Sequence, residues 1–349
     1  MRCMSDWIER IHAIEALEDA EFDRQLVSDM AAQAQRMPLP AIRFSTPTFK
    51  EYDTGEVKGC SKNSFPAFSI TGSACGLNCD HCQTKILEPM ISATQPDVLD
   101  RKVRELIATQ GLQGFLLSGG SNRRNEIHYE RFYPVLETLK RDHPGLKIAI
   151  HTALTDSAGA KRMEAAGVDT AMMDVIGAEE TIRQVYHLER SVDDFEATLA
   201  ALTATRMEVS PHIVIGLHYG ELLGEANALD MVARYPTHAL VLVVIMPFYA
   251  KPGTFKTPAT GDVGRIFLQA RARLPDRQVL LGCARPAGMH KRVTDAYAVM
   301  AGLDGIAFPA EGAMSLSAAL QRPWIQEHSC CSIKVGMTRD VVQVRSCAA

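Results

Sequence analysis

The sequence lacks any apolar run of the roughly 18–20 residues that a helix needs to cross a bilayer. It also lacks the apolar core of a signal peptide, because charged residues already stand among the first ten positions. These two absences argue against a membrane-spanning or secreted protein. We therefore expect a cytoplasmic protein with no membrane partner.

A strong excess of charge is missing too. The chain has 37 Lys and Arg against 41 Asp and Glu, which gives a formal net charge of −4 at pH 7. That balance offers no electrostatic attraction to nucleic acid or to an anionic membrane, so we expect neither as a partner. With 46% hydrophobic and 22% charged residues, the composition is that of a globular protein with an ample core.

Cysteine, in contrast, is frequent, with nine residues in the chain. Disulfides are rare in a reducing compartment, so metal ligation or catalysis explains such cysteines better. Cys75, Cys79 and Cys82 form a C-x₃-C-x₂-C triplet, whose spacing lets one loop aim three sulfurs at a common centre. A closed zinc site or a fully ligated iron–sulfur cluster needs four ligands. Either a fourth ligand comes from elsewhere, or one iron stays open to an exchangeable ligand; a zinc or redox site is the alternative.

Short apolar runs alternate with helical patterns from residue 65 onward, which is typical of parallel strands joined by right-handed crossovers. Eight such units predict an α/β fold, a (β/α)₈ TIM-type barrel, with a doubly wound open sheet as the alternative. We expect strands at 67–71, 114–117, 147–152, 170–175, 210–215, 239–246, 278–282 and 305–308. We expect the intervening helices at 98–109, 129–141, 157–166, 192–205, 222–234, 262–273, 291–300 and 315–321.

The rest of the chain flanks this predicted barrel. Residues 1–64 are expected to form an N-terminal extension, helical at first and then rich in loops. Residues 65–325 would be the barrel, and residues 326–349 a cysteine-containing C-terminal tail over the barrel mouth.

The C-terminal ends of barrel strands carry active sites, so the residues there are candidates. The second expected strand ends at Gly119, Gly120 and Ser121, where consecutive glycines let the backbone approach a ligand; a plain turn is the alternative. His151 and Asp174 close the next two strands. A carboxylate at the end of an apolar strand more often faces a ligand than stays buried and unpaired. His151 could meet a cofactor or substrate, or hydrogen-bond within the barrel.

Four more cysteines are candidates for a second site: Cys60, Cys283, Cys330 and Cys331. In a barrel, both ends of the domain can meet at the mouth, where four thiols could ligate an auxiliary [4Fe–4S] cluster. Two adjacent exposed thiols give no packing benefit, which favours ligation. The alternative is that Cys283 is a small core residue and that the Cys330-Cys331 pair is incidental.

Together these features resemble the radical SAM superfamily, in which S-adenosyl-L-methionine binds the open iron of a [4Fe–4S] cluster. The resemblance covers about residues 65–310. It implies that Cys75, Cys79 and Cys82 hold the cluster. It also implies the residues that contact the cofactor, with Ser121 standing where the family usually has glutamate: His81, Gly119, Gly120, Ser121, His151, Asp174 and Gly216.

The stretch from Phe68 to Cys82, with Leu87–Met90 and Leu281–Pro286, resembles in particular one subunit of the two-protein lipoyl synthase, in the biotin synthase-related branch. This resemblance implies a sulfurtransferase of lipoate biosynthesis that inserts sulfur into an unactivated C–H bond of a protein-bound octanoyl-lysine. It further implies three partners: an octanoylated lipoyl-carrier protein or peptide, a second radical SAM subunit, and an electron donor such as ferredoxin or flavodoxin. The auxiliary cluster would be the sulfur donor.

Two other functions compete with this interpretation. One is a cofactor maturase or small-molecule mutase of the same branch, which needs no sulfur insertion and no second cluster. The other is a non-catalytic iron–sulfur or metal-binding scaffold with a degenerate site. The intact triplet, Gly119-Gly120 and Asp174 argue against the scaffold.

Overall fold

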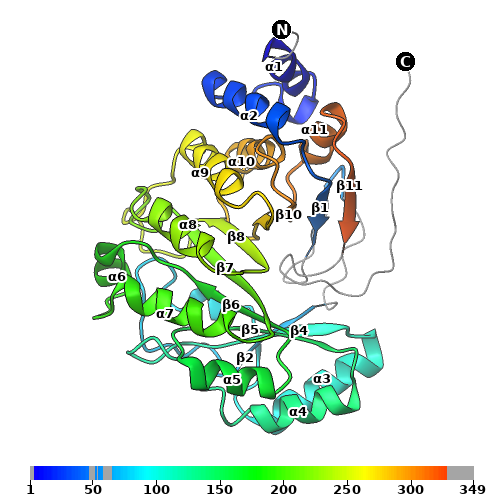
Figure 1. Ribbon diagram of the computed structural model, residues 1–349. Helices are drawn as coiled ribbons and strands as arrows, with labels where there is room; N and C mark the ends of the chain where they lie inside the picture. Colours follow the sequence, from blue (N-terminus) through cyan, green and yellow to red (C-terminus); the bar gives the residue numbers. More distant parts are fainter. Residues whose placement is uncertain (1–3, 47–51, 53, 58–64, 328–349) are drawn as a thin grey trace.

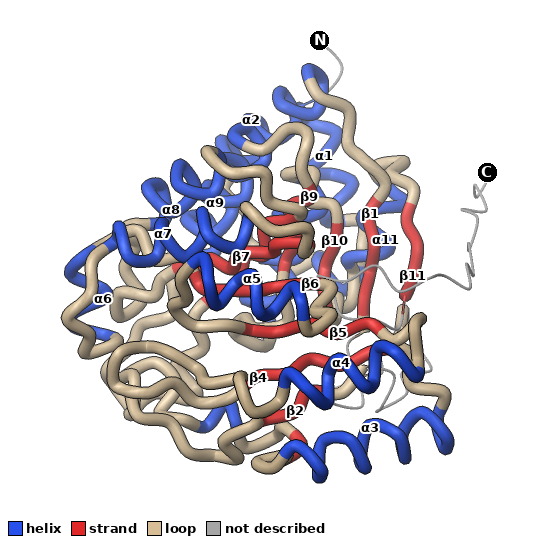
Figure 2. The backbone as a smooth tube through the Cα atoms, turned by 60° about the horizontal axis from the view of Figure 1, so that its bottom comes forward, coloured by secondary structure: helices blue, strands red, loops and turns tan. Residues whose placement is uncertain are grey.

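The structure, a computed structural model, describes residues 4–46, 52, 54–57 and 65–327. Its strands form one parallel sheet that curls into a half-barrel, with helices on the outer face (Figure 1). Figure 2 shows the curl from another direction, with α3 (Pro96–Gln110) and α4 (Tyr133–Asp142) on the outside. An α/β fold with a curled parallel sheet is therefore confirmed.

The described strands follow the order β11-β1-β10-β9-β8-β7-β6-β5-β4-β2-β3. The strands are β1 Ile42–Ser45, β2 Ala67–Ser69, β3 Ile91–Ser92, β4 Gly114–Ser118, β5 Lys147–His151, β6 Thr170–Asp174, β7 Glu208–Ile215, β8 Ala239–Val244, β9 Gln278–Leu281, β10 Gly305–Ala307 and β11 Trp324–Glu327. The eight predicted strands are all present, as β2 and as β4 through β10.

A closed barrel of eight strands is not confirmed. Within the described residues β10 does not pair with β2; it pairs with β1, which in turn pairs with β11. β1 was not expected, because four residues, of which Ile42 and Phe44 are buried, are too few to show a reliable period of two. The division of the chain at residues 64 and 325 stays a prediction, although β1 and β11 belong to the same sheet as the predicted barrel strands.

Helices occupy every predicted helical segment. Besides α3 and α4 they are α1 Met4–His12, α2 Arg24–Arg36, α5 Ser157–Ala165, α6 Glu179–Val185, α7 Val192–Thr203, α8 Glu225–Ala233, α9 Thr260–Arg273, α10 Met289–Met300 and α11 Ala313–Ala319. Only the short α6 was not predicted in this part of the chain. Local signals set several ends, as where Pro96 begins α3 and Gly111, at φ +64°, ends it. None of the described helices has the length and apolar character needed to cross a membrane.

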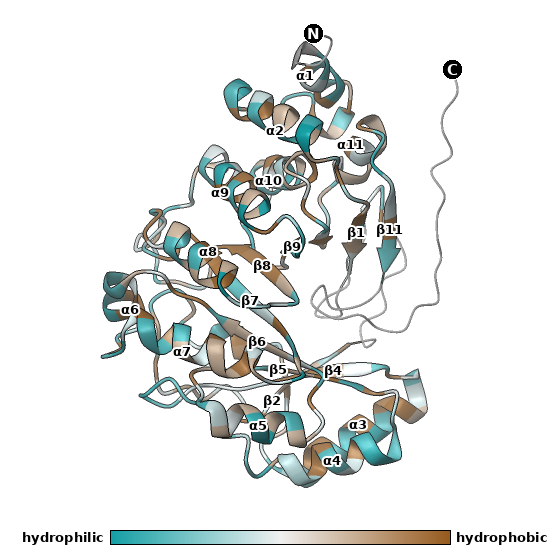
Figure 3. Ribbon diagram, viewed as in Figure 1, coloured by the Kyte–Doolittle hydropathy of each residue, from teal (hydrophilic) through white to brown (hydrophobic). Residues whose placement is uncertain are grey.

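The two faces of the sheet differ in what they bury. A continuous core lies between the outer face and the helices (Figure 3), and includes Phe115, Ile150 and Leu242. The inner face carries a different set, because side chains alternate along each strand. Paired residues of neighbouring strands share a face, so Asp174 and His212 stand in one row with Val241 and Leu280. This inner face positions the candidate site.

Candidate functional site

The cysteine triplet lies in the loop that leaves β2 at the C-terminal edge of the sheet. Cys79 is buried, whereas Cys75 and Cys82 are partly exposed. The loop has left-handed backbone at Asn78 and again at Gln83-Thr84. Residues other than glycine avoid this conformation at a cost of about 1–3 kcal/mol each, so contacts from outside must hold the loop in shape.

The thiols of Cys79 and Cys82 lie close enough to hydrogen-bond to each other. That bond raises the pKa of Cys79, with burial adding to the effect, and lowers the pKa of Cys82. No three His, Cys, Asp or Glu side chains of the described residues converge closely enough for one metal ion. Three thiols without an oxygen ligand suit an iron–sulfur cluster, in which each thiolate binds its own iron.

Gly119 and Gly120 lie against the cysteine loop. A Cβ on Gly120 would stand 2.0 Å from the carbonyl oxygen of Ala74 and 2.6 Å from the Cα of Cys75. The backbone N–H of Gly76 donates to the carbonyl oxygen of Ser121 over 2.7 Å. The glycines therefore allow the end of β4 to pack on the loop. This packing is enough to explain why both residues are glycine. Their predicted contact, and that of Ser121, with a cofactor stays a prediction.

His81 begins a series of polar side chains that leads from the loop to the inner face. Its ring lies 5.0 Å from that of Tyr186, and the Tyr186 hydroxyl donates to Asp174 over 3.4 Å. Asp174 is 3.7 Å from Nε2 of His151, whose ring centroid lies 5.4 Å from that of His212. Three predicted residues, His81, His151 and Asp174, are thus brought together, and Tyr186 and His212 join them.

Burial fixes the state of several of these groups. Desolvation lowers the pKa of His81 and of His212 to about 4 each, so both imidazoles are neutral near pH 7. Desolvation also raises the pKa of Tyr186, which keeps its hydroxyl a donor. The Nδ1 atom of His81 is buried and has no hydrogen-bond partner in the described part of the chain. Such an atom is costly unless a ligand or water satisfies it.

Gly216 has different surroundings from those expected of a cofactor contact. It sits at the turn after β7 with φ +78°, and a Cβ there would lie 2.3 Å from Pro258. Its N–H donates to the buried carboxylate of Glu225 over 2.8 Å. The turn and the packing both require glycine, and a role near the adenine stays a prediction.

The second cysteine set can be followed only in part. Cys283 is exposed just beyond the C-terminal end of β9. Cys60, Cys330 and Cys331 lie outside the described residues. The chain leaves the sheet toward Cys60 at the end of β1, and toward Cys330 and Cys331 at the end of β11. β11, β1, β10 and β9 are neighbours in this order and all run parallel. These exits and Cys283 therefore share one edge of the sheet.

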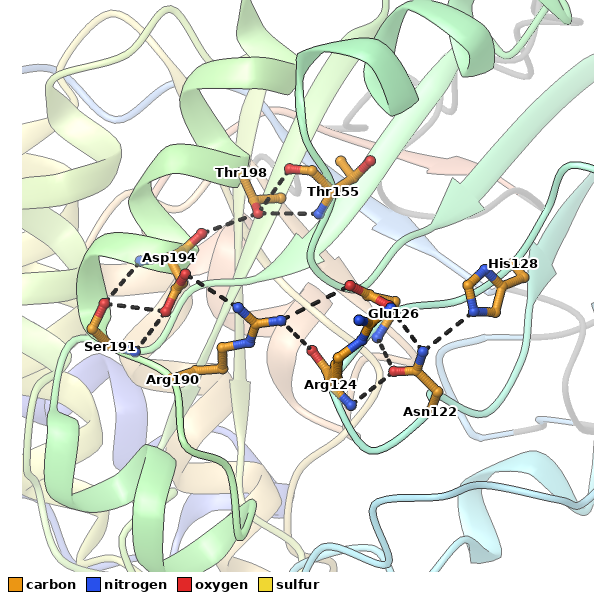
Figure 4. A network of polar contacts seen from close by, with 9 residues as sticks. All are labelled: Asn122, Arg124, Glu126, His128, Thr155, Arg190, Ser191, Asp194 and Thr198. Carbon is orange, nitrogen blue, oxygen red and sulfur yellow. Dashed lines mark hydrogen bonds and ion pairs between the residues drawn. The ribbon is translucent and has the colours of Figure 1, made fainter.

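The loop between α6 and α7, residues 186–191, was not singled out from the sequence. Besides Tyr186 it supplies Arg190, whose guanidinium lies 3.4 Å from the carbonyl oxygen of Arg124 and 3.9 Å from Glu126 (Figure 4). Asp194 completes a capping box with Ser191 and lies 3.6 Å from Arg190. This network holds the segment that follows Gly119-Gly120. The Ser-x-x-Asp capping pattern was the one signal in the sequence.

A loop of three thiols at the C-terminal edge of a curled parallel sheet makes this α/β protein a candidate iron–sulfur protein. Residues 69–231 match the family model described as the Radical SAM superfamily. The matched segment contains the triplet, Gly119-Gly120, Asp174 and Gly216. This part of the chain is therefore similar to the Radical SAM superfamily, a family that implies a [4Fe–4S] cluster and S-adenosylmethionine.

Solved structures of similar fold include methylornithine synthase (PylB), with a TM-score of 0.52 and 12% identity, covering 87% of this chain and 82% of that one. The hydrogenase maturase HydG has a TM-score of 0.58 and 11% identity, covering 93% and 76%. HydG from Carboxydothermus hydrogenoformans has a TM-score of 0.54 and 14% identity, covering 94% and 80%. At these identities the likeness shows the fold alone. No curated protein matches the sequence.

Proposed function

We propose that this protein is a radical SAM enzyme in which Cys75, Cys79 and Cys82 hold a [4Fe–4S] cluster. The observation that carries the proposal concerns His81, which stands between two of these thiols in sequence: its Nδ1 atom is buried and has no hydrogen-bond partner among the described residues. A ligand bound beside the loop would satisfy it. When bound, the reduced cluster with S-adenosylmethionine supplies hydrogen-atom abstraction from carbon.

The chain's own residues position the ligand. Asp174 presents a carboxylate that is already oriented by the Tyr186 hydroxyl and is free to accept hydrogen bonds from a ribose. His151, partly exposed beside it, faces the same space. Gly119 and Gly120 bring backbone groups next to the thiols. These residues bind and orient, while the buried surface around them limits the access of water.

We propose sulfur insertion into an octanoyl-lysine of a carrier protein as the reaction. The inner face of β8 to β10 is apolar, but Val241, Leu280 and Phe308 are already buried there, so the partly exposed Val243 beside them would contact an aliphatic chain. Cys283 stands at the edge above this surface, and with Cys60 and the Cys330-Cys331 pair it would hold an auxiliary [4Fe–4S] cluster as sulfur donor. A second radical SAM subunit and a ferredoxin or flavodoxin would be the protein partners.

A second candidate function is that of a cofactor maturase or small-molecule mutase. The polar, partly exposed side chains of His151 and Asp174 on the inner face favour it. The polar side chains at Asp174, His151 and His212 would then contact a small polar substrate as well as the cofactor. This function needs no cluster at Cys283.

Iron and sulfide analysis after anaerobic reconstitution tests these functions. Sulfur insertion predicts about eight irons per chain, falling to about four when Cys75, Cys79 and Cys82 are all changed to Ala. About four irons in the unchanged chain, lost in the triple variant, favour the maturase or mutase. No iron contradicts both functions.

Incubation with S-adenosylmethionine, reductant and an octanoyl-lysine peptide tests the substrate. We expect 5′-deoxyadenosine together with a peptide that gains the mass of one sulfur, and a Cys283→Ser variant that forms the nucleoside without adding sulfur. If 5′-deoxyadenosine forms but the peptide never gains sulfur, with or without the second subunit, sulfur insertion is wrong.

A further inference from the structure

Asp80 lies inside the triplet, between Cys79 and Cys82, and makes three contacts with two other loops. Its backbone N–H donates to the carbonyl oxygen of Val185 over 3.0 Å. One carboxylate oxygen accepts from the Tyr219 hydroxyl at 3.0 Å, and the other lies 3.0 Å from Nε2 of His187. A residue placed between two of the thiols is thus tied to the end of α6, to the loop that follows α6 and to the loop that follows β7.

The two residues that reach Asp80 share an unusual backbone. His187 has φ +56° and Tyr219 has φ +53°, in the left-handed region that bulky residues rarely adopt. Such conformations persist only where the surroundings impose them, and they gather at functional sites. Here each one directs a polar side chain to the same carboxylate.

Tyr219 is itself well anchored. Its hydroxyl lies 3.1 Å from the carbonyl oxygen of Gln184, and its ring lies 5.0 Å from that of Phe255. The N–H of Lys256 donates to its carbonyl oxygen over 3.0 Å. The ring of Tyr219 is therefore fixed, and its single hydroxyl hydrogen is shared between Asp80 and the carbonyl oxygen of Gln184, both within hydrogen-bond distance.

The opposite side of the cysteine loop is held by different contacts. There Gly76 donates to Ser121, and Gly120 donates to Thr71 over 2.7 Å. Asp80 supplies the corresponding anchor on the side of Cys79 and Cys82. Hydrogen bonds within the loop, such as those from the backbone N–H and the side chain of Gln83 to the carbonyl oxygen of Cys79, add to this anchor.

We propose that Asp80 is a positioning residue that holds the cysteine loop ready to bind the cluster, through a clamp made of His187 and Tyr219. The proposal rests on the proposed function, because it assigns the held thiols to a cluster. It concerns the shape of the loop before the cluster arrives, so it can be tested on the metal-free protein.

The first measurement is the rate of thiol alkylation at each cysteine of the metal-free, reduced protein, followed by mass spectrometry. Cys79 is only 5% exposed and should react slowly, with the exposed Cys283 as internal reference. We expect Asp80→Ala to speed alkylation of Cys79 at least tenfold, and Tyr219→Phe about threefold, with Cys283 unchanged. Asp100→Ala, which removes an aspartate bonded to Arg104 on α3, is the matched control and should change neither rate.

The second measurement is made after anaerobic reconstitution with limiting iron and sulfide. We expect Asp80→Ala to retain less than a third of the wild-type iron and to alter the electron paramagnetic resonance spectrum of the reduced cluster. Tyr219→Phe removes one hydroxyl and keeps the ring, so it decides the question if Asp80→Ala fails to fold. Adding Tyr219→Phe to Asp80→Ala should change the Cys79 rate less than twofold.

The clamp would be overturned if Asp80→Ala and Tyr219→Phe both keep the alkylation rate of Cys79, the iron content and the spectrum of the wild-type protein. Faster alkylation of Cys79 together with loss of the helical circular dichroism signal would also overturn it, because that pattern indicates general unfolding; Cys283 is exposed already and does not report it. If the wild-type chain takes up no iron, the proposed function fails, and the alkylation comparison still decides whether Asp80 holds the loop.

Discussion

The two halves of the inner face of the sheet differ sharply in chemistry. On β5, β6 and β7 this face carries His151, Asp174 and His212. On β8 and β9 the same face carries Val241 and Leu280, buried with Phe308. The border runs between His212 and Val241, which are partners in register. A single strand boundary therefore separates a partly exposed surface that offers hydrogen bonds from an apolar surface that is already buried within the protein.

The halves also differ in how they are supported. Beside the apolar half, Arg285 and Asp295 form a fully buried ion pair at 2.6 Å. Arg285 also donates to the carbonyl oxygen of Phe308, a residue at φ +50°. In the polar half, the side chains of His151 and Asp174 are 30% and 32% exposed. We infer that the apolar half is fixed by its own core and that the polar half is left open for a ligand.

The largest expected effect concerns this support. Asp295→Ala would leave Arg285 buried without its carboxylate, and should lower the free energy of unfolding by about 3–5 kcal/mol. Asp174→Ala, the matched change in the polar half, should cost about 1 kcal/mol or less, because that carboxylate is partly hydrated. Urea denaturation of both variants measures the two values. Equal losses would contradict the difference in support.

Ligand binding should show the opposite ranking. Asp174→Ala should weaken binding of S-adenosylmethionine to the reconstituted protein at least tenfold, about 1.4 kcal/mol, because it removes an oriented acceptor. Val243→Ala, on the same face of β8 and two residues beyond Val241, should change this affinity less than twofold. Calorimetric titration under anaerobic conditions measures both. If Asp174→Ala weakens binding twofold or less, S-adenosylmethionine does not bind at the polar half.

Exchanging polarity between the halves sharpens the comparison further. Val241→Thr keeps the shape but buries a hydroxyl among apolar groups, and should cost about 1–3 kcal/mol. Ser210, one residue pair deeper, has a buried Oγ without a hydrogen-bond partner among the described residues. Ser210→Ala should therefore be neutral or stabilise the fold by up to about 1 kcal/mol. Chemical denaturation measures the free energy of unfolding of both variants. A Val241→Thr variant more stable than the wild type would contradict the prediction.

The smallest expected effect is a dependence on pH. Burial lowers the pKa of His212 from 6.5 to about 4, so the folded state keeps this imidazole neutral while the unfolded chain binds a proton below 6.5. The stability should be complete above pH 6.5 and fall as the pH drops toward 4, with a loss of about 1 kcal/mol near pH 5.5. His212→Asn should reduce this slope relative to the wild type. An unchanged slope would show that His212 is not held neutral.

Much of the fold followed from local pattern. Strands such as Ala239–Val244 and helices such as Thr260–Arg273 have enough residues to show their period, and both were predicted. β1 was not, because a four-residue strand obtains its place from its partners β10 and β11. The triplet was equally visible, because its meaning lies in spacing along the chain.

The contacts that hold the loop were not predictable in the same way. Asp80, His187 and Tyr219 are far apart in sequence, and none stands in a pattern that marks it. Gly119-Gly120 were predicted to let the backbone approach a ligand; the neighbour that the structure shows is the cysteine loop, and the contact with a ligand stays a prediction. Side chains on loops acquire neighbours only when the fold is complete, so their roles need the structure.

The position of β1 has a consequence for the order of events during synthesis. Most strands of the sheet can pair with a neighbour made shortly before or after them, whereas Ile42–Ser45 must wait for β10 and β11, near the other end of the chain. Contacts between distant segments form late and slowly. A nascent chain that ends before residue 305 therefore holds its first strand without either of its partners. The described sheet is therefore complete only after β10 and β11 have left the ribosome.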